Sequence, residues 1–235
     1  MGKKHFNFGD VLGYGWHVMK ADIWFFVGVG FIWMIISYIP TIVHMVLPHL
    51  QLSETTYWVL YTITTLTGWV IGIILNIGLI KIALSFCDEI KPTIGSLFDA
   101  WDCFWRYVGV AILYGLVVLG GLILLIIPGI VWAVKFGLCF YFVIDKGLGP
   151  IEALKASGRT TMGVKWELFG FGILCGMINY VGLLCLIVGI FATYPTVIVA
   201  TALVYRQLSA QTPELGEFGL TTPFAQPDAE FLPIQ

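Results

Sequence analysis

The chain from Arg106 to Lys146 reads RYVGVAILYGLVVLGGLILLIIPGIVWAVKFGLCFYFVIDK. Two apolar runs, 106–127 and 130–146, meet at the sequence IPGI, and a basic residue closes the stretch at each end. A bilayer core about 30 Å thick needs roughly 20 apolar helical residues to cross it. Proline presets one backbone angle of a tight turn, and glycine permits the other. The stretch therefore predicts two antiparallel membrane-spanning helices joined by very few residues.

The rest of the chain extends this pattern. It is 59% hydrophobic and 11% charged, with a mean hydropathy of +0.92, whereas a soluble domain is about 25% charged. We therefore expect an all-α, polytopic membrane domain over residues 1–207. Its six transmembrane helices should lie at about 23–46, 58–86, 106–127, 130–146, 166–188 and 190–207.

Basic residues predict which side each connection occupies. Apart from Lys135, all Lys and Arg residues fall at the N-terminus, within 81–106, within 146–165, or just after the last apolar run. Because basic residues near membrane helices stay in the cytoplasm, both termini should be cytoplasmic. Tryptophan prefers the headgroup level, and Trp24, Trp105 and Trp166 mark the predicted inner ends of spans 1, 3 and 5.

The last segment, 208–235, differs from the rest of the chain. It contains four prolines and four acidic residues but no basic residue, which predicts a disordered cytoplasmic tail.

The cytoplasmic connections carry a further pattern. Apolar residues recur at helical spacing in 8–20, 93–105 and 150–162, which predicts amphipathic helices lying in the interface. Asp88 and Asp145, like Leu97 and Leu154, lie 57 positions apart. We infer three similar units, each made of a surface helix and two spans, with the same orientation in the membrane.

Part of the chain resembles a known group of proteins. The IPGI turn, the sequence GPIEALKAS at 149–157 and the sequence MGVKWELF at 162–169 resemble prokaryotic six-span integral membrane proteins. That group includes the membrane domain found beside some glycerophosphodiester phosphodiesterases. The resemblance covers roughly residues 72–208 and implies six helices in a bacterial or archaeal cytoplasmic membrane. In the phosphodiesterase relatives a separate soluble domain carries catalysis, so the resemblance transfers no catalytic residue.

Three polar residues within the predicted spans are candidates for an intramembrane site. Lys135 should sit roughly 7–8 Å inside the outer end of span 4. It could bind an anionic solute or a lipid headgroup, or it could reach the outer interface or helix-end carbonyls with its long side chain. Asn76 and Asn179 could bond helix to helix or bind a solute.

Cytoplasmic charges suggest a second set of candidates. Four basic residues on one interfacial segment should attract anionic lipid at roughly 1 kcal/mol each, although the positive-inside rule alone also places basic residues there. These residues are Lys146, Lys155, Arg159 and Lys165. The carboxylates of Asp88 and Asp145 are expected on solvated faces.

The sequence contains no catalytic constellation, no Cys and His spacing typical of a metal site, and no dinucleotide fingerprint. The net charge of -2 gives no basis for nucleic-acid binding. We expect no enzymatic activity and no cofactor. The leading hypothesis is an integral protein of a prokaryotic cytoplasmic membrane that organises membrane lipids or a membrane or cytoplasmic partner protein. The alternative is a small-solute or lipid transporter or channel that uses Lys135 and the intramembrane amides.

Overall fold

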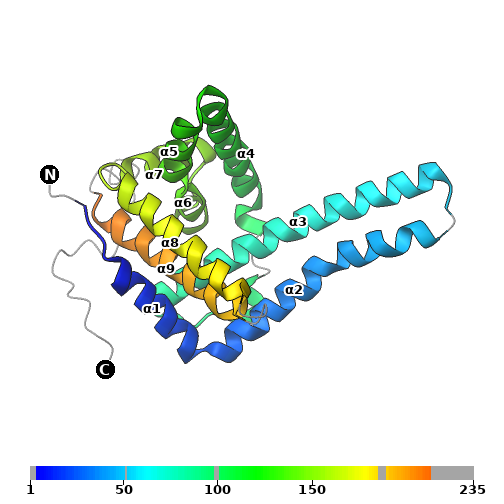
Figure 1. The fold of residues 1–235 in the computed structure, drawn as a ribbon, viewed down its shortest axis with the longest axis horizontal. Helices are drawn as coiled ribbons and strands as arrows, with labels where there is room; N and C mark the ends of the chain where they lie inside the picture. The colour runs from blue at the N-terminus through cyan, green and yellow to red at the C-terminus, as the bar shows by residue number, and fades with distance from the viewer. Residues whose placement is uncertain (1–3, 51, 98–100, 185–188, 213–235) are drawn as a thin grey trace.

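The computed structural model describes residues 4–50, 52–97, 101–184 and 189–212, and within these ranges every regular element is a helix (Figure 1). The α-helices are α1 (Phe8–Ala21), α2 (Ile23–Val46), α3 (Glu54–Cys87), α4 (Trp101–Leu124), α5 (Ile126–Phe136), α6 (Cys139–Lys146), α7 (Pro150–Thr160), α8 (Lys165–Leu184) and α9 (Ile190–Ala210). Two 3-10 helices, η1 (Leu47–His49) and η2 (Ile94–Leu97), lie between them. The predicted tail lies outside the described residues from position 213 onward.

Five stretches are long and apolar enough to cross a membrane. They are Ile23–His49, Glu54–Cys87, Ile94–Leu124, Ile126–Lys146 and Lys165–Leu184. The protein is therefore an all-α, multi-pass membrane protein. The sixth predicted span, 190–207, is helical as α9 but is not among the five. Tyr194, Pro195 and Arg206 make α9 less apolar than α2, α3, α4, α5 and α8.

The helices form three hairpins, α2–α3, α4–α5 and α8–α9. Figure 1 shows α2–α3 projecting as a long arm, while α4–α5 leaves the body of the molecule in another direction. Large apolar side chains such as Trp69, Ile123 and Leu184 are exposed along the hairpins. Contiguous apolar surface of this kind is unfavourable in water and suits lipid.

The buried core lies where the three hairpins meet. Its largest fully buried side chains include Tyr205 of α9, Phe142 of α6 and Met19 of α1. α9 occupies the centre, since it packs against α1, α2, α3 and α8. The least apolar of the predicted spans, α9, is thus packed on several sides by other helices.

The hairpin turn at the start of span 4 differs from the prediction. α4 ends at Leu124 and α5 begins at Ile126, so the chain reverses at Leu125, which is extended with φ -169 and ψ 151. Pro128 lies in the first turn of α5, where a missing N–H costs no helical hydrogen bond. Gly129 lies against Gly121 and Leu122 of α4, and a Cβ on Gly121 would come within 2.9 Å of the Gly129 Cα. The predicted turn at the Pro-Gly pair was wrong, because the glycine permits helix contact instead.

Span 4 is also broken. α5 ends at Phe136 and α6 begins at Cys139, whereas a single helix was expected over 130–146. α7 packs at this break: the hydroxyls of Ser157 and Thr161 each donate to the Lys135 carbonyl at 3.0 Å. Two side-chain donors thus reach the backbone where the helix is interrupted.

The predicted surface helices pack against protein. α1 lies on α9, with Gly15 against the backbone of Thr196 and Ala200. Leu97 of η2 touches Gly78 of α3. The small-residue face of α7 is buried against α4, α5 and α6, so this face is not presented to lipid. Over 93–105 the chain forms η2 and then the first turn of α4, and Phe98 lies outside the described residues.

Candidate functional site

One arginine joins the ends of three helices. Arg206 of α9 donates from Nη2 to Asp88 Oδ2 at 2.6 Å and from Nη1 to Asp145 Oδ2 at 2.8 Å. The Tyr205 hydroxyl donates to the same Asp145 oxygen at 2.7 Å, and Lys146 Nζ lies 3.4 Å from it. Asp88 follows α3, and Asp145 belongs to α6. We call these five residues the basal cluster.

The basal cluster is largely shielded from water. The side chains of Asp145 and Arg206 are 11% and 13% exposed, and that of Asp88 is 27% exposed. Two carboxylates face two cations, so the formal charges cancel. In a shielded site these charge-assisted bonds are stronger than in water, and removing one partner leaves an uncompensated charge. Burial raises the pKa of the Asp88 carboxyl, and this effect outweighs the attraction of the Arg206 guanidinium, which lowers that pKa.

The expectation that Asp88 and Asp145 lie on solvated faces was wrong. Each is at the end of an apolar helix, which by itself suggests exposure to the cytoplasm. The fold brings Arg206 to them from positions that are 118 and 61 residues away. One Asp145 oxygen already takes bonds from Arg206 and Tyr205. This arrangement joins α3, α6 and α9. Within the described ranges, no group of three His, Cys, Asp or Glu side chains could hold a metal ion.

Lys135 lies at the break between α5 and α6. Because α5 begins at Ile126, Lys135 is roughly 13 Å along the helix from the hairpin tip, deeper than expected. Its Nζ is 4.9 Å from the centroid of the Phe136 ring, within the range of a cation–π contact. The stem of the side chain lies against Gly158 of α7. The structure therefore places the predicted intramembrane lysine against α7.

The two amides occupy different surroundings. Asn76 Oδ1 accepts a hydrogen bond from the Tyr107 hydroxyl at 3.0 Å, which links α3 to α4. Asn179 Oδ1 on α8 is buried and has no hydrogen-bond partner among the described residues. Lys135, Asn76 and Asn179 lie on three different helices, and none of them lines either cavity described below.

The four basic residues of the predicted lipid contact are divided by the fold. Lys146 is 18% exposed and belongs to the basal cluster. Lys155 is exposed on α7, while Arg159 and Lys165 are half-buried near the α7–α8 connection. Lys4 also reaches this region, because its Nζ donates to the carbonyls of Arg159 and Thr160 at 2.9 and 3.1 Å. A cation at the end of α7 offsets the partial negative charge of the helix C-terminus.

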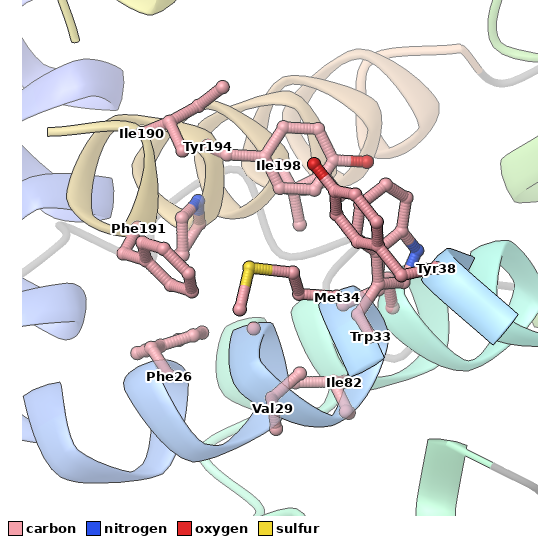
Figure 2. A pocket seen from close by; sticks show the side chains of 13 residues that line it. Phe26, Val29, Trp33, Met34, Tyr38, Ile82, Ile190, Phe191, Tyr194 and Ile198 are labelled. Carbon is pink, nitrogen blue, oxygen red and sulfur yellow. The ribbon is translucent and has the colours of Figure 1, made fainter. Parts of the chain in front are cut away.

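An apolar cavity of about 350 Å³ lies between α2, α3 and α9 (Figure 2). We call it the interhelical cavity. Its volume falls within the range of about 300–1,000 Å³ that is typical of ligand pockets. Its lining residues come from three helices: Phe26, Val29, Gly30, Trp33, Met34, Tyr38, Leu79, Ile82, Ile190, Phe191, Tyr194, Pro195 and Ile198.

A second cavity of about 260 Å³ lies within the arm, between α2 and α3. It is more polar and is lined in part by Ser37, Thr41, His44 and Thr65. His44 Nε2 is 2.8 Å from Thr64 Oγ1. The hydrogen bond joins the two helices of the arm.

Sequence reasoning missed both the basal cluster and the interhelical cavity. The equal spacing of Asp88 and Asp145 was visible as a repeat, but a repeat does not reveal a shared partner. No pattern in the sequence indicated the cavity, because its apolar lining residues resemble those of every other membrane segment. No known protein family, no curated protein and no solved structure matches this chain. The resemblance to six-span prokaryotic proteins therefore stays a prediction based on the sequence motifs.

Proposed function

We propose that this protein is a non-enzymatic, multi-pass protein of a prokaryotic cytoplasmic membrane that organises lipids at the cytoplasmic surface. The observation that carries the proposal is a set of exposed tryptophans at the starts of the three hairpins. Trp24, Trp105 and Trp166 are 84%, 79% and 77% exposed, and they lie near the N-terminal ends of α2, α4 and α8. Exposed indoles favour the headgroup level, where the ring and the N–H group are both satisfied.

The proposal includes six spans in three units with both termini in the cytoplasm. Support comes from the packing of the three segments that begin the units. α1 packs on α9, η2 packs on α3, and α7 packs on α5 and α6. The first segment of each unit thus contacts the last span of a different unit. The basal cluster joins the same three last spans, which contain α3, α6 and α9. α9 would be the sixth span, with α1, α2, α3 and α8 covering its polar side chains.

Anionic headgroups would bind beside α7 and the start of α8. We assign this role to Lys155, which is exposed, and to Lys165, while Lys146 is already paired with Asp145. Trp166 lies next to Lys165 in the sequence and is exposed, so an apolar anchor and a cation are adjacent. Each basic residue near an anionic membrane surface contributes about 1 kcal/mol.

Lipid retention tests the proposal. Protein would be reconstituted in nanodiscs of mixed phosphatidylglycerol and phosphatidylcholine, and the lipids that stay bound would be measured by native mass spectrometry. The wild type should enrich phosphatidylglycerol, and the double variant Lys155→Glu, Lys165→Glu should lower that enrichment about tenfold or more.

A charge-matched control is Lys20→Glu, Lys91→Glu, which reverses two exposed lysines elsewhere. This control should retain most of the enrichment. An unchanged ratio in the first variant, or an equal fall in both variants, would contradict a lipid site at α7 and α8.

A second candidate function is transport of a small anion. It is favoured by one observation: the span Ile126–Lys146 is interrupted beside Lys135, and interrupted spans form the binding sites of many transporters. Lys135→Met tests it, because the bonds from Ser157 and Thr161 go to the Lys135 carbonyl and would survive. A transporter should move chloride or inorganic phosphate into liposomes, and the variant should not. Equal uptake by protein-free liposomes and liposomes carrying the wild type would reject this candidate.

A further inference from the structure

The interhelical cavity has a buried floor and a more open rim. Val29, Ile82 and Phe26 are 2%, 1% and 4% exposed and form the floor. Trp33 and Tyr38, which are 40% and 58% exposed, contribute to the rim. The cavity therefore offers a dry apolar end and an accessible end.

Hydrogen-bonding groups gather at the accessible end. Figure 2 shows the hydroxyl groups of Tyr38 and Tyr194 at the same end of the cavity, away from Phe26 and Val29. Each of the two hydroxyls can donate and accept a hydrogen bond, so this end of the cavity can hold a group that both donates and accepts.

The lining also defines the charge of the occupant. Among the described residues that line the cavity, none is an Asp, Glu, Lys, Arg or His. An ionised headgroup placed there would lose its hydration without gaining an opposite charge, which is strongly unfavourable. A polar solute would likewise leave most of its hydrogen bonds unmade against the apolar floor. A hydrocarbon chain matches the floor, and an uncharged polar end matches the rim.

We propose that the interhelical cavity binds the hydrocarbon chain of an uncharged, hydroxyl-bearing lipid, with the chain against Val29 and Ile82 and the hydroxyl end at Tyr38 and Tyr194. The inference rests on the proposed function only in assuming that the protein works in a lipid membrane. The source of the ligand is the surrounding bilayer, since α2 and α3, which supply two walls, are long and apolar enough to span it.

Photolabelling tests this site. The probe is a monoacylglycerol that carries a diazirine near the end of its chain, added to phosphatidylcholine liposomes that contain the full chain. Labelled peptides are located by mass spectrometry. Labels should concentrate on α2 between residues 26 and 34, on α3 around Leu79 and Ile82, and on the facing part of α9, above the level on the exposed surface of α4.

Two neighbouring positions give matched variants. Met34→Trp places a bulky ring in the cavity, while Ile35→Trp adds the same ring at an exposed position that does not line it. Filling the cavity should lower labelling there about tenfold, and the control should leave it unchanged. The double variant Tyr38→Phe, Tyr194→Phe should lower monoacylglycerol labelling about fivefold while sparing labelling by a diazirine hydrocarbon without a headgroup. Size-exclusion elution identifies any variant that has lost its fold, and the milder Tyr variants then decide.

Several outcomes would overturn the proposal. These are labels spread evenly over all exposed helices, labelling that survives Met34→Trp, and equal labelling by a diazirine fatty acid ionised at the working pH. Failure here is distinct from failure of the proposed function, because phosphatidylglycerol enrichment depends on Lys155 and Lys165 of α7 and α8. If the protein retains anionic lipid but shows no labelling by the hydrocarbon chain, the proposed function stands and the lipid site in the interhelical cavity is rejected.

Discussion

Asp88 and Asp145, which are 57 positions apart in the chain, are bound by the two Nη atoms of the same arginine side chain. Arg206 thereby joins the ends of α3 and α6 to α9. Figure 1 shows the α2–α3 and α4–α5 hairpins extending in different directions. A network in which several charges share partners restricts relative motion more than isolated pairs do, because one bond cannot open without leaving another group unpaired.

The residues of the basal cluster should contribute unequally to the stability of the fold. Asp145→Asn removes the charge that Arg206, Tyr205 and Lys146 share, and it should lower the melting temperature in detergent by roughly 10 °C. Asp88→Asn should cost less, because Asp88 is more exposed and, among the described residues, its carboxylate is hydrogen-bonded by Arg206 alone. Asp102→Asn, at an exposed position on α4, serves as the charge-matched control. Equal shifts for the Asp145 and Asp102 variants would show that the network contributes no stability.

Acidification should act through Asp88 in a defined direction. Burial raises the pKa of Asp88 above its ordinary value of 3.8, so the folded protein binds this proton more tightly than the unfolded chain does. The free energy of unfolding contributed by this group therefore rises as the pH falls through the raised pKa toward 3.8. The melting temperature of the wild type minus that of Asp88→Asn should therefore increase as the pH is lowered from 7 to 4. A decrease would mean that the Arg206 pair controls the pKa instead.

Two adjacent threonines at the C-terminal end of α7, Thr160 and Thr161, permit a direct comparison. Thr161 donates to the Lys135 carbonyl, whereas Thr160 Oγ1 is buried and has no hydrogen-bond partner among the described residues. Thr161→Val should lower the free energy of unfolding by about 1 kcal/mol, while Thr160→Val should be neutral or stabilising. Thermal unfolding of the two variants in the same detergent checks this order. The reverse order would indicate that α7 is not held to the α5–α6 break through Thr161.

The contact between α1 and α9 should depend on one glycine. A Cβ on Gly15 would meet the carbonyl oxygen of Thr196 and approach the Ala200 nitrogen at 3.2 Å. Gly15→Ala should therefore cost about 1–3 kcal/mol through overpacking. Gly13 has nothing within 4 Å of its Cβ position, so Gly13→Ala should be neutral or slightly stabilising. Protease cleavage within α1 gives an independent reading, since a displaced helix is cut faster.

Membrane topology separates six spans from five. If α9 crosses the bilayer, reporter tags at the N-terminus and the C-terminus should lie in one compartment, and a tag at residue 52 in the other. Five spans would place the termini on opposite sides. A tag at residue 52 in the same compartment as the C-terminus would contradict the charge-based topology.

Hydrophobic periodicity and length were enough to predict the helical class and most helix positions. α2, at Ile23–Val46, coincides with the predicted range, and α3 extends the predicted 58–86 by a few residues at its start. Five of the predicted spans correspond to stretches that can cross a membrane. These features follow from local composition, since a long apolar segment must satisfy its backbone internally and must avoid water.

The tertiary structure alone decided which residues meet. Asp88, Asp145 and Arg206 look like separate helix-end charges in the sequence, and only the packing of α3, α6 and α9 brings them within hydrogen-bond distance. Lys135 acquired α7 as a neighbour for the same reason. In a chain that is apolar nearly everywhere, hydrophobicity determines that segments form helices but does not distinguish one helix surface from another. Which helix surfaces meet is decided by close contacts at Gly15, Gly78 and Gly129 and by a few shielded charges. These contacts require one particular geometry, whereas the burial of apolar surface is non-directional.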